Sequence, residues 1–396
     1  MAVLPEAVSH PLELRHEHRL CFTRGVFAPG NPLLASVLAP RDPGLTPRAL
    51  VCWDAGLESA FPGFAARIEA WFAAHADQVR LAAPPVRLPG GEAVKNDLRH
   101  LETVWAAINA AGLCRHSYVV AVGGGAVLDL VGFGASTAHR GIPLVRLPTT
   151  SLSQGDGGVG VKNGINFFGK KNWLGAFTVP HAIVNDLDFL TGLPPRERRC
   201  GLIEAVKVAL IRDAAFFQYI AGQVAALRAL EPAPFEAVIC ESARQHLRHI
   251  ATAGDPFELG SARPLDFGHW AAHKLEQLSE FRVSHGEAVA VGMAVDLLYS
   301  VKIDLLPRET AEEILNLIET VGFEVWSAEL DREERGRPVI LAGLEEFREH
   351  LGGRLTITLV PGIGEKLEVH EMDENAILAA ISELRTRSGR LAKVTK

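Results

Sequence analysis

Two histidines and one glutamate supply the residue types of a divalent-metal site. Glu204 lies in the otherwise apolar, helix-like run GLIEAVKVAL, and His269 and His285 are separated by sixteen positions farther along the chain. A carboxylate in such a run must be paired, metal-bound or at the edge of a cleft. Two imidazoles and one carboxylate suit zinc and leave a coordination position open for a substrate oxygen. These residue types predict a site that could polarise an oxygen.

Two further side chains share helix faces with these candidates. Lys207 follows Glu204 by three residues, and His273 follows His269 by one helical turn. His273 could shuttle protons or be an ordinary histidine on a helix surface. In the same way, Glu204 and Lys207 could form only a salt bridge within one helix, with His269 and His285 as surface residues. Spacing alone leaves these alternatives open.

A run of three glycines, at positions 123–125, follows an apolar strand and precedes an expected helix. Glycine lets backbone amides approach a phosphate, and the start of a helix adds a partial positive charge. The pattern G-x-G-x-x-G is absent, so this is not the standard dinucleotide fingerprint. Asp129 either faces a cofactor or lies on an exposed helix face. The turn therefore predicts a nucleotide site or, alternatively, a tight turn without a ligand.

The elements that must position these residues change character along the chain. Between 96 and 147 an expected helix (96–111, capped by Asn96) is followed by a strand, a helix and a strand, which predicts a parallel sheet flanked by helices. We expect early strands within 11–27 and a long functional loop over 151–180. Beyond about 196 the pattern is mainly helical. The expected domains are a nucleotide-binding α/β domain (1–190) and an α-helical metal- and substrate-binding domain (191–396).

The bulk composition excludes several classes of protein. The 396 residues carry a formal net charge of −7, which argues against a nucleic-acid-binding footprint. The apolar runs are too short to cross a bilayer, and the N-terminus lacks the pattern of a secretory signal. The five cysteines are scattered and form no CxxC pair. They read as reduced thiols, so we expect a cytoplasmic protein that binds no membrane.

Taken together, the motifs identify a family resemblance. They are GGGAVLDLVGFGAS, RGIPLVRLPTTSLSQGDGGVGVKNGIN, GKKNWLGAF, LPPRERRCGLIEAVKVALIRD, DFGHWAAHKLE and HGEAVAVGMAVD. In this order they resemble 3-dehydroquinate synthase and its relatives, the sugar phosphate cyclases, over about 86–292, with a weaker tail to 363. The resemblance implies an N-terminal nucleotide-binding α/β domain, an α-helical C-terminal domain and an active site between them. It also implies NAD, zinc or cobalt, and a homodimer.

The resemblance assigns roles to individual residues. The implied metal ligands are Glu204, His269 and His285. The implied NAD contacts are Asp54, Glu92, Lys95, Gly124, Gly125, Asp129, Thr149 and Thr150. The implied catalytic residues are Asp156, Lys162, Lys207 and His273, and the implied substrate contacts include Lys171 and Asn172. Arg140 would reach the phosphate of the substrate in the neighbouring subunit.

The implied chemistry is redox-neutral and eliminates phosphate, which makes the enzyme a carbon–oxygen lyase. NAD oxidises a ring hydroxyl whose oxygen the metal polarises. The ketone acidifies the adjacent C–H, inorganic phosphate leaves by β-elimination, and NADH then reduces the ketone. The product opens and closes again by an intramolecular aldol addition, which gives a carbocycle. Lysines that bind the phosphate hold the leaving group in place.

The sequence departs from 3-dehydroquinate synthase where that enzyme binds the substrate carboxylate. An arginine of the family falls on Ala262, with Arg263 one position away, and Asp266 replaces an asparagine. An upstream lysine is replaced by His246 or Arg248. A guanidinium displaced by one residue points elsewhere, and an aspartate adds negative charge. We therefore expect a ketose phosphate without a carboxylate, such as sedoheptulose 7-phosphate, as the substrate.

Other departures keep alternatives open. The cyclases that act on sedoheptulose 7-phosphate typically lose the second histidine, whereas His273 remains, and Arg348 is the nearest replacement for a late Asp-Lys-Lys motif. Authentic 3-dehydroquinate synthase is one alternative. An NAD-dependent polyol dehydrogenase is another, although it would not need the cluster of Lys162, Lys171 and Asn172. A metal-stabilised binding protein is a third.

Overall fold

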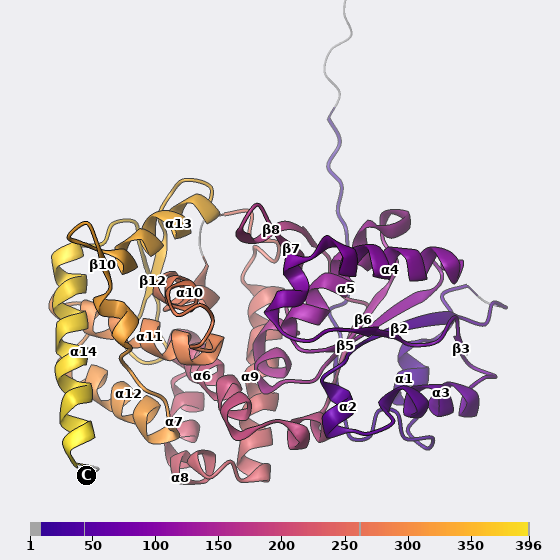
Figure 1. Cartoon of the computed structure of the whole chain (residues 1–396), viewed down its shortest axis with the longest axis horizontal. Coiled ribbons are helices and arrows are strands. Elements are labelled where there is room, and N and C mark those ends of the chain that lie inside the picture. The colour runs from indigo at the N-terminus through magenta and orange to yellow at the C-terminus, as the bar shows by residue number, and fades with distance from the viewer. Residues whose placement is uncertain (1–8, 43, 261–262, 395–396) are drawn as a thin grey trace, which may run out of the picture.

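The computed structural model describes residues 9–42, 44–260 and 263–394. A parallel sheet flanked by helices forms the N-terminal part, and helices form most of the C-terminal part (Figure 1). This confirms the predicted fold class, whereas the division into domains at 190/191 stays a prediction. In the part of the chain that the structure describes, no helix has the length and apolarity needed to span a membrane.

The sheet has seven strands in the order β1-β9-β6-β5-β2-β3, with β4 also paired to β2. All of these pairings are parallel. The strands are β1 (Leu20–Thr23), β2 (Arg48–Asp54), β3 (Arg80–Leu81), β4 (Val86–Leu88), β5 (Tyr118–Gly123), β6 (Leu144–Pro148) and β9 (Ala182–Asp186). Because parallel strands end at the same edge, the ends of β2, β5 and β6 bring Asp54, Gly123 and Pro148 to one side of the sheet.

Both faces of the sheet are buried, which explains its continuous apolar strands. Along β2 the side chains alternate, so that Leu50 packs on one face and Val51 on the other. One face is covered by α1 (Leu33–Val37) and α3 (Phe64–Ala74), and the other by α4 (Leu98–Ala110) and α5 (Gly125–Thr137). This packing fixes the start of α5 directly behind the end of β5.

Two local expectations in the N-terminal part were wrong. The helix expected over 96–111 begins at Leu98, and its cap is Asp97, whose side chain accepts a hydrogen bond from the Arg99 amide, rather than Asn96. Asn96 instead ends the short helix η1 (Glu92–Asn96). Of the region 11–27, only the four residues of β1 form a strand.

The segment 151–180 is not the aperiodic loop that we expected. Its first part is a π-helical turn, η3 (Ser153–Gly157), and its second part is an antiparallel hairpin of β7 (Lys162–Phe167) and β8 (Lys170–Phe177). The hairpin packs on α5 through a close approach, because a Cβ on Gly132 would lie 1.7 Å from Asn163 Oδ1. Polar, glycine-rich strands concealed the hairpin from a reading of hydrophobic alternation.

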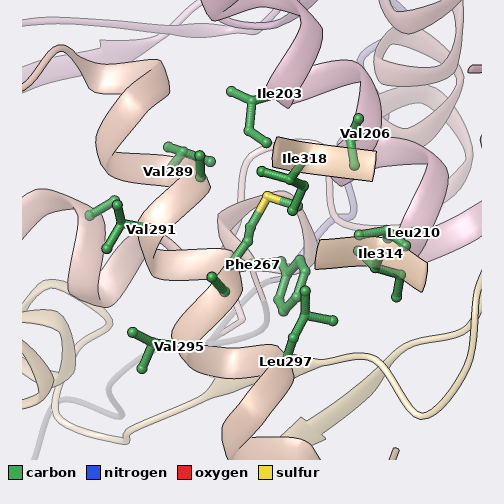
Figure 2. Packing of buried hydrophobic residues seen from close by; sticks show 14 of the residues in the cluster. Ile203, Val206, Leu210, Phe267, Val289, Val291, Val295, Leu297, Ile314 and Ile318 are labelled. Atoms are coloured by element: carbon green, nitrogen blue, oxygen red, sulfur yellow. The ribbon is translucent and has the colours of Figure 1, made fainter. Parts of the chain in front are cut away.

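The C-terminal part is built around buried helices. Its helices are α6 (Pro195–Arg212), α7 (Ala214–Gly222), α8 (Val224–Arg228), α9 (Pro232–Thr252), α10 (His269–Leu278), α11 (His285–Lys302), α12 (Arg308–Val321), α13 (Ala342–His350) and α14 (Glu374–Val394). Figure 2 shows Ile203 and Val206 of α6 beside Ile318 of α12, with Phe267 between α11 and α12. Phe267 lies two residues before His269, so this core anchors the start of α10 against α6 and α11.

Candidate active site

Helix α6 presents Glu204 and Lys207 to the sheet-containing part of the chain. Both side chains are almost fully buried, and Lys207 Nζ lies 2.5 Å from Glu204 Oε2 and 3.0 Å from Asp156 Oδ2 on the π-helical turn. Among the described residues, no donor meets either Glu204 oxygen with hydrogen-bond geometry. Burial raises the pKa of Glu204 to about 7, although Lys207 opposes this shift. Lys207 forms an ion pair with Oε2, whereas a cation bound at Oε1 would satisfy the remaining oxygen of this buried carboxylate.

His269 and His285 begin two successive helices, and both turn one imidazole nitrogen toward Glu204. His269 Nδ1 lies 3.1 Å from the carbonyl oxygen of Phe267, and His285 Nδ1 lies 3.1 Å from Glu276 Oε2. An oxygen acceptor at Nδ1 fixes the proton there and leaves Nε2 with its lone pair available for a metal. The start of α11 is held by a capping box between Ser284 and Glu287.

The three predicted ligands converge. One ligand atom from each of Glu204, His269 and His285 lies within 4.8 Å of the other two, and His285 Nε2 is 3.7 Å from Glu204 Oε1. Zinc takes such a carboxylate and two imidazoles at about 2.0–2.2 Å and keeps a further position open. The unsatisfied carboxylate and the two oriented imidazoles therefore fit a divalent ion.

His273 joins this cluster from the next turn of α10. Its ring centroid lies 5.4 Å from that of His269 and 6.0 Å from that of His285, and the rings of His273 and His285 are stacked. Burial lowers the pKa of His273 to about 3, and the Lys171 cation contributes to this shift. The imidazole is therefore neutral near pH 7, and its lone pair can accept a hydrogen bond.

Asp156 is the partner through which Lys207 is held. Its second oxygen, Oδ1, lies 2.6 Å from His246 Nδ1 on α9. Burial raises the pKa of Asp156, but Lys207 and His246 outweigh this effect and hold it well below the usual range. His246 is buried and Arg248 is exposed, so the structure selects His246 from the two candidates for the upstream position.

Lys162 and Arg263 are both engaged by Glu258, a residue that the sequence analysis missed. Glu258 Oε1 lies 2.7 Å from Lys162 Nζ, and Oε2 lies 2.9 Å from Arg263 Nε. Arg263 also donates to the carbonyl oxygens of Glu258 and Gly260, so its guanidinium turns into its own loop. Burial alone would raise the pKa of Asp266, but the neighbouring Lys162 and His269 outweigh this effect and lower the pKa to about 2. Ala262 lies outside the described residues.

The glycine turn forms the gap between the end of β5 and the start of α5. Gly124 is the N-cap of α5, and a Cβ there would lie 3.3 Å from the methyl group of Thr150. No atom lies within 4 Å of the Cβ position of Gly125, so this glycine faces open space. The buried Thr149 donates its amide proton to the carbonyl of Gly123. Open space at a helix N-terminus fits a pyrophosphate group.

Other predicted NAD contacts surround this turn. Asp54 ends β2, and its Oδ1 accepts a 2.8 Å hydrogen bond from the Gly56 amide. Lys95 is buried, lies 2.8 Å from Asp129 Oδ2 and 3.9 Å from Glu92 Oε1, and also donates to Asn172 Oδ1. One lysine therefore connects the predicted cofactor residues with a predicted substrate residue of the hairpin.

Three other predicted substrate residues lie in different settings. Lys171, on β8, lies 3.5 Å from Glu276 Oε2 in the helical part. Arg140 is exposed and ends the short helix η2 (Ala138–Arg140), which follows α5. Arg348 is half-exposed on α13 and pairs with Glu345. The structure therefore brings Lys171 to Glu276, which contacts the predicted ligand His285, whereas Arg140 and Arg348 are exposed.

Asp296 of α11 positions the end of α10 that carries His269. It is fully buried, and its two oxygens accept hydrogen bonds from Trp270 Nε1 (2.8 Å) and the Gly268 amide (3.1 Å). Gly268 needs a positive φ of 79°, and a Cβ there would lie 2.6 Å from the Met293 amide nitrogen. Asp296 thus stabilises the turn at Gly268 that orients His269.

Burial raises the pKa of Asp296 from 3.8 to about 7, which gives a testable dependence of stability on pH. Because the folded protein favours the neutral carboxyl group, its stabilising contribution is full below about pH 4 and is lost as the pH rises through about 7. Asp296→Asn stays neutral, so its free energy of unfolding should lack this decline. Urea unfolding from pH 4 to 8 measures the difference, with the exposed Asp304→Asn as the control. Equal pH slopes in wild type and Asp296→Asn would exclude this account.

Comparison with protein families matches both parts of the chain. The model described as 3-dehydroquinate synthase N-terminal matches residues 85–200, and that described as 3-dehydroquinate synthase C-terminal matches 201–337. A 3-dehydroquinate synthase of Symbiobacterium thermophilum is 42% identical over 248 residues, which are 63% of this chain and 66% of that protein. A 2-epi-5-epi-valiolone synthase of Streptomyces glaucescens is 33% identical over 377 residues, 94% of this chain and 92% of that protein.

Solved structures give the same family. The 2-epi-5-epi-valiolone synthase of Streptomyces hygroscopicus subsp. jinggangensis 5008, with NAD+ and Zn2+ bound, has a TM-score of 0.83 at 28% identity. That match covers 96% of this chain and 100% of the other. A 2-deoxy-scyllo-inosose synthase shares the fold at 22% identity, with a TM-score of 0.72 over 92% of this chain and 96% of that one. The matches span more than half of the chain and bracket its glycine turn, hairpin and histidine cluster, and the chain therefore belongs to the sugar phosphate cyclases, the 3-dehydroquinate synthase-like superfamily of enzymes.

Proposed function

We propose that this protein is an NAD- and metal-dependent cyclase whose substrate is a phosphorylated ketose without a carboxylate, such as sedoheptulose 7-phosphate. The metal is zinc or cobalt, held by Glu204, His269 and His285. The similarity to a 2-epi-5-epi-valiolone synthase over 94% of the chain supports the reaction class. The NAD+ and Zn2+ in the structure of another such enzyme support the cofactors.

The pairing of Glu258 with two cations carries the choice of substrate. Lys162 and Arg263 could each receive a substrate carboxylate, but Glu258 already holds both. The nearby Asp266 adds a second negative charge. A carboxylate in a closed site needs a lysine or a bidentate arginine, and leaving it unpaired costs several kcal/mol. A neutral sugar head group avoids this cost and can donate hydroxyl protons to these acids.

The proposed mechanism divides the work among the clustered residues. When bound, the metal supplies a Lewis acid for a substrate oxygen and NAD supplies a hydride acceptor. The N-terminus of α5 binds the pyrophosphate, and Lys171 and Asn172 bind the sugar phosphate. Lys207, held between Glu204 and Asp156, binds a ring hydroxyl and stabilises negative charge on its oxygen. His273, which lies beside His269 and His285, is the candidate acceptor for the proton that elimination of phosphate requires.

The other contacts in this proposal follow the same division. Asp54, at the carboxyl end of β2, binds the ribose hydroxyls, as a carboxylate does in related sheets. Lys95 and the two carboxylates that it contacts, Glu92 and Asp129, also bind the cofactor. Phosphate elimination makes the enzyme a carbon–oxygen lyase, and we propose that it acts in the cytoplasm.

Release of phosphate without accumulation of NADH is the expected result that tests this function. Purified protein loaded with zinc should release inorganic phosphate from sedoheptulose 7-phosphate with substoichiometric NAD, because each cycle regenerates NAD. A parallel assay uses the keto acid phosphate from which 3-dehydroquinate is made. Stoichiometric NADH without phosphate release would establish a polyol dehydrogenase instead.

One alternative has specific support. The 42% identity to a 3-dehydroquinate synthase and the retained His273 favour that reaction. In that case the keto acid phosphate should be converted efficiently, and Arg263→Ala should abolish the conversion. Under our proposal the keto acid phosphate is a poor substrate, and Arg263→Ala does not reduce turnover of the ketose phosphate to background.

The proposed homodimer rests on Arg140, which is exposed on the short helix after α5 and which the family resemblance assigns to the substrate of the neighbouring subunit. We expect the protein to be a dimer in which Arg140 contacts the sugar phosphate bound by the partner. Arg140→Ala should raise the KM for the sugar phosphate by about tenfold or more, consistent with loss of a charge-assisted hydrogen bond, and should leave NAD affinity unchanged. Light scattering and steady-state kinetics test this, with the exposed Arg115→Ala as the control. A fully active monomer would contradict it.

A further inference from the structure

Glu276 is a buried carboxylate on α10 that touches a metal-ligand candidate from behind. Its Oε2 lies 3.1 Å from His285 Nδ1, and the residue is 5% exposed. It also faces Lys171 Nζ at 3.5 Å, a lysine on the hairpin of the other part of the chain. The sequence carried a signal for it, because Glu276 follows His269 by seven residues and His273 by three, which places all three on one helix face.

We propose that Glu276 is a positioning residue that sets the metal affinity of this site by fixing the orientation and tautomer of His285. This inference rests on the proposed metal ligands Glu204, His269 and His285. An ionised carboxylate only accepts hydrogen bonds, so it holds the imidazole proton on Nδ1 and directs the lone pair of Nε2 toward Glu204 Oε1, 3.7 Å away. The negative charge also increases the basicity of the ring and therefore its strength as a ligand.

The other two ligand candidates are not oriented by a carboxylate in this way. His269 Nδ1 donates to a backbone carbonyl, that of Phe267, which side-chain substitution cannot remove. Glu204 is oriented by its position on a buried helix and by Lys207. Of the two histidines, His285 is therefore the one whose orientation depends on a replaceable side chain. Lys171 gives that side chain its counter-charge, which stabilises a carboxylate in a buried position.

Substitution of Glu276 should weaken metal binding more than it weakens the fold. Glu276→Ala removes the acceptor, and we expect the zinc dissociation constant to rise by about 10- to 100-fold, the usual effect of losing such a partner. Glu276→Gln should weaken binding too, because its amide can turn its NH2 group toward Nδ1 and move the ring proton to Nε2. Zinc affinity is measured by competition with a chromophoric chelator, so the measurement does not depend on turnover.

A matched control separates this effect from a general loss of carboxylate charge. Glu280→Gln makes the same chemical change at an exposed position just beyond α10 and should leave zinc affinity unchanged. Thermal unfolding of the metal-free proteins checks that each variant folds. A lowered melting temperature with wild-type zinc affinity in both Glu276 variants would show a purely structural role and overturn the proposal.

One further variant distinguishes failure of this inference from failure of the metal site itself. His285→Ala should abolish tight zinc binding if the ligand set is right. If wild type and His285→Ala bind zinc equally, the proposed ligand set is wrong and the inference falls with it. If His285→Ala loses zinc but Glu276→Ala keeps wild-type affinity, the ligand set stands and only the role of Glu276 is refuted.

Discussion

Replacing His269 with alanine should remove bound metal and enzymatic turnover together. His269 Nε2 is one of three converging donor atoms, and its ring is held by the Phe267 carbonyl and by the turn that Asp296 anchors. Without this imidazole only two of the three ligands, Glu204 and His285, remain, which are too few for a stable site. We expect a loss of turnover of about 10³-fold or more, since every interaction of the metal with the transition state disappears.

The measurement pairs elemental analysis of the purified variant with the phosphate-release assay. His116→Ala, at an exposed position, is the control and should keep both metal and activity. NAD binding should also persist in His269→Ala, because the glycine turn belongs to a different part of the chain. A His269→Ala protein that keeps stoichiometric zinc would refute the assignment.

Replacing Arg146 with methionine should destabilise the fold more than any surface change. Its guanidinium is fully buried and donates to the carbonyl oxygens of Gly158, Gly160 and Lys162 and to Asn163 Oδ1. Four acceptors would lose their donors at once, and a buried acceptor without a donor costs about 1–3 kcal/mol. We expect the free energy of unfolding to fall by at least about 3 kcal/mol.

Chemical denaturation followed by circular dichroism measures this change. Arg146→Lys tests the geometry, because an ammonium keeps the charge but cannot reproduce the planar fork, and it should recover only part of the lost stability. The exposed Arg115→Met should change the free energy of unfolding by no more than about 0.5 kcal/mol. If Arg146→Met and Arg115→Met have equal effects, Arg146 does not support the fold in this way.

The sequence predicted those features that follow from periodicity or from a specific motif. The buried strands around Val120 and the long helices had strong apolar patterns, so their types were predictable although their ends were not. Residue types made Glu204, His269 and His285 candidates, the family resemblance assigned them as the ligand set, and the structure brings these side chains together. The parallel sheet followed from the alternation of strands and helices.

The features that escaped depend on contacts between distant residues. Glu258 and Lys162 are far apart in sequence and form a pair only because the hairpin approaches the loop before α10. The hairpin itself was hidden, since Gly132 and Asn163 permit its packing on α5 without an apolar pattern. The partner of Arg263 could not be inferred from an ungapped alignment, because a loop conformation decides where its guanidinium points.

The position of Lys95 has a consequence for how strongly the two proposed ligands affect each other's binding. One ammonium group contacts Asp129 and Glu92, on the cofactor side, and Asn172, on the substrate side. If binding of the cofactor reorients the Lys95 ammonium, it changes the dissociation constant of the sugar phosphate. Thermodynamic reciprocity then requires the sugar phosphate to change the affinity for the cofactor by the same factor. If these residues bind the cofactor and the sugar phosphate as proposed, a single buried cation makes the two binding equilibria interdependent.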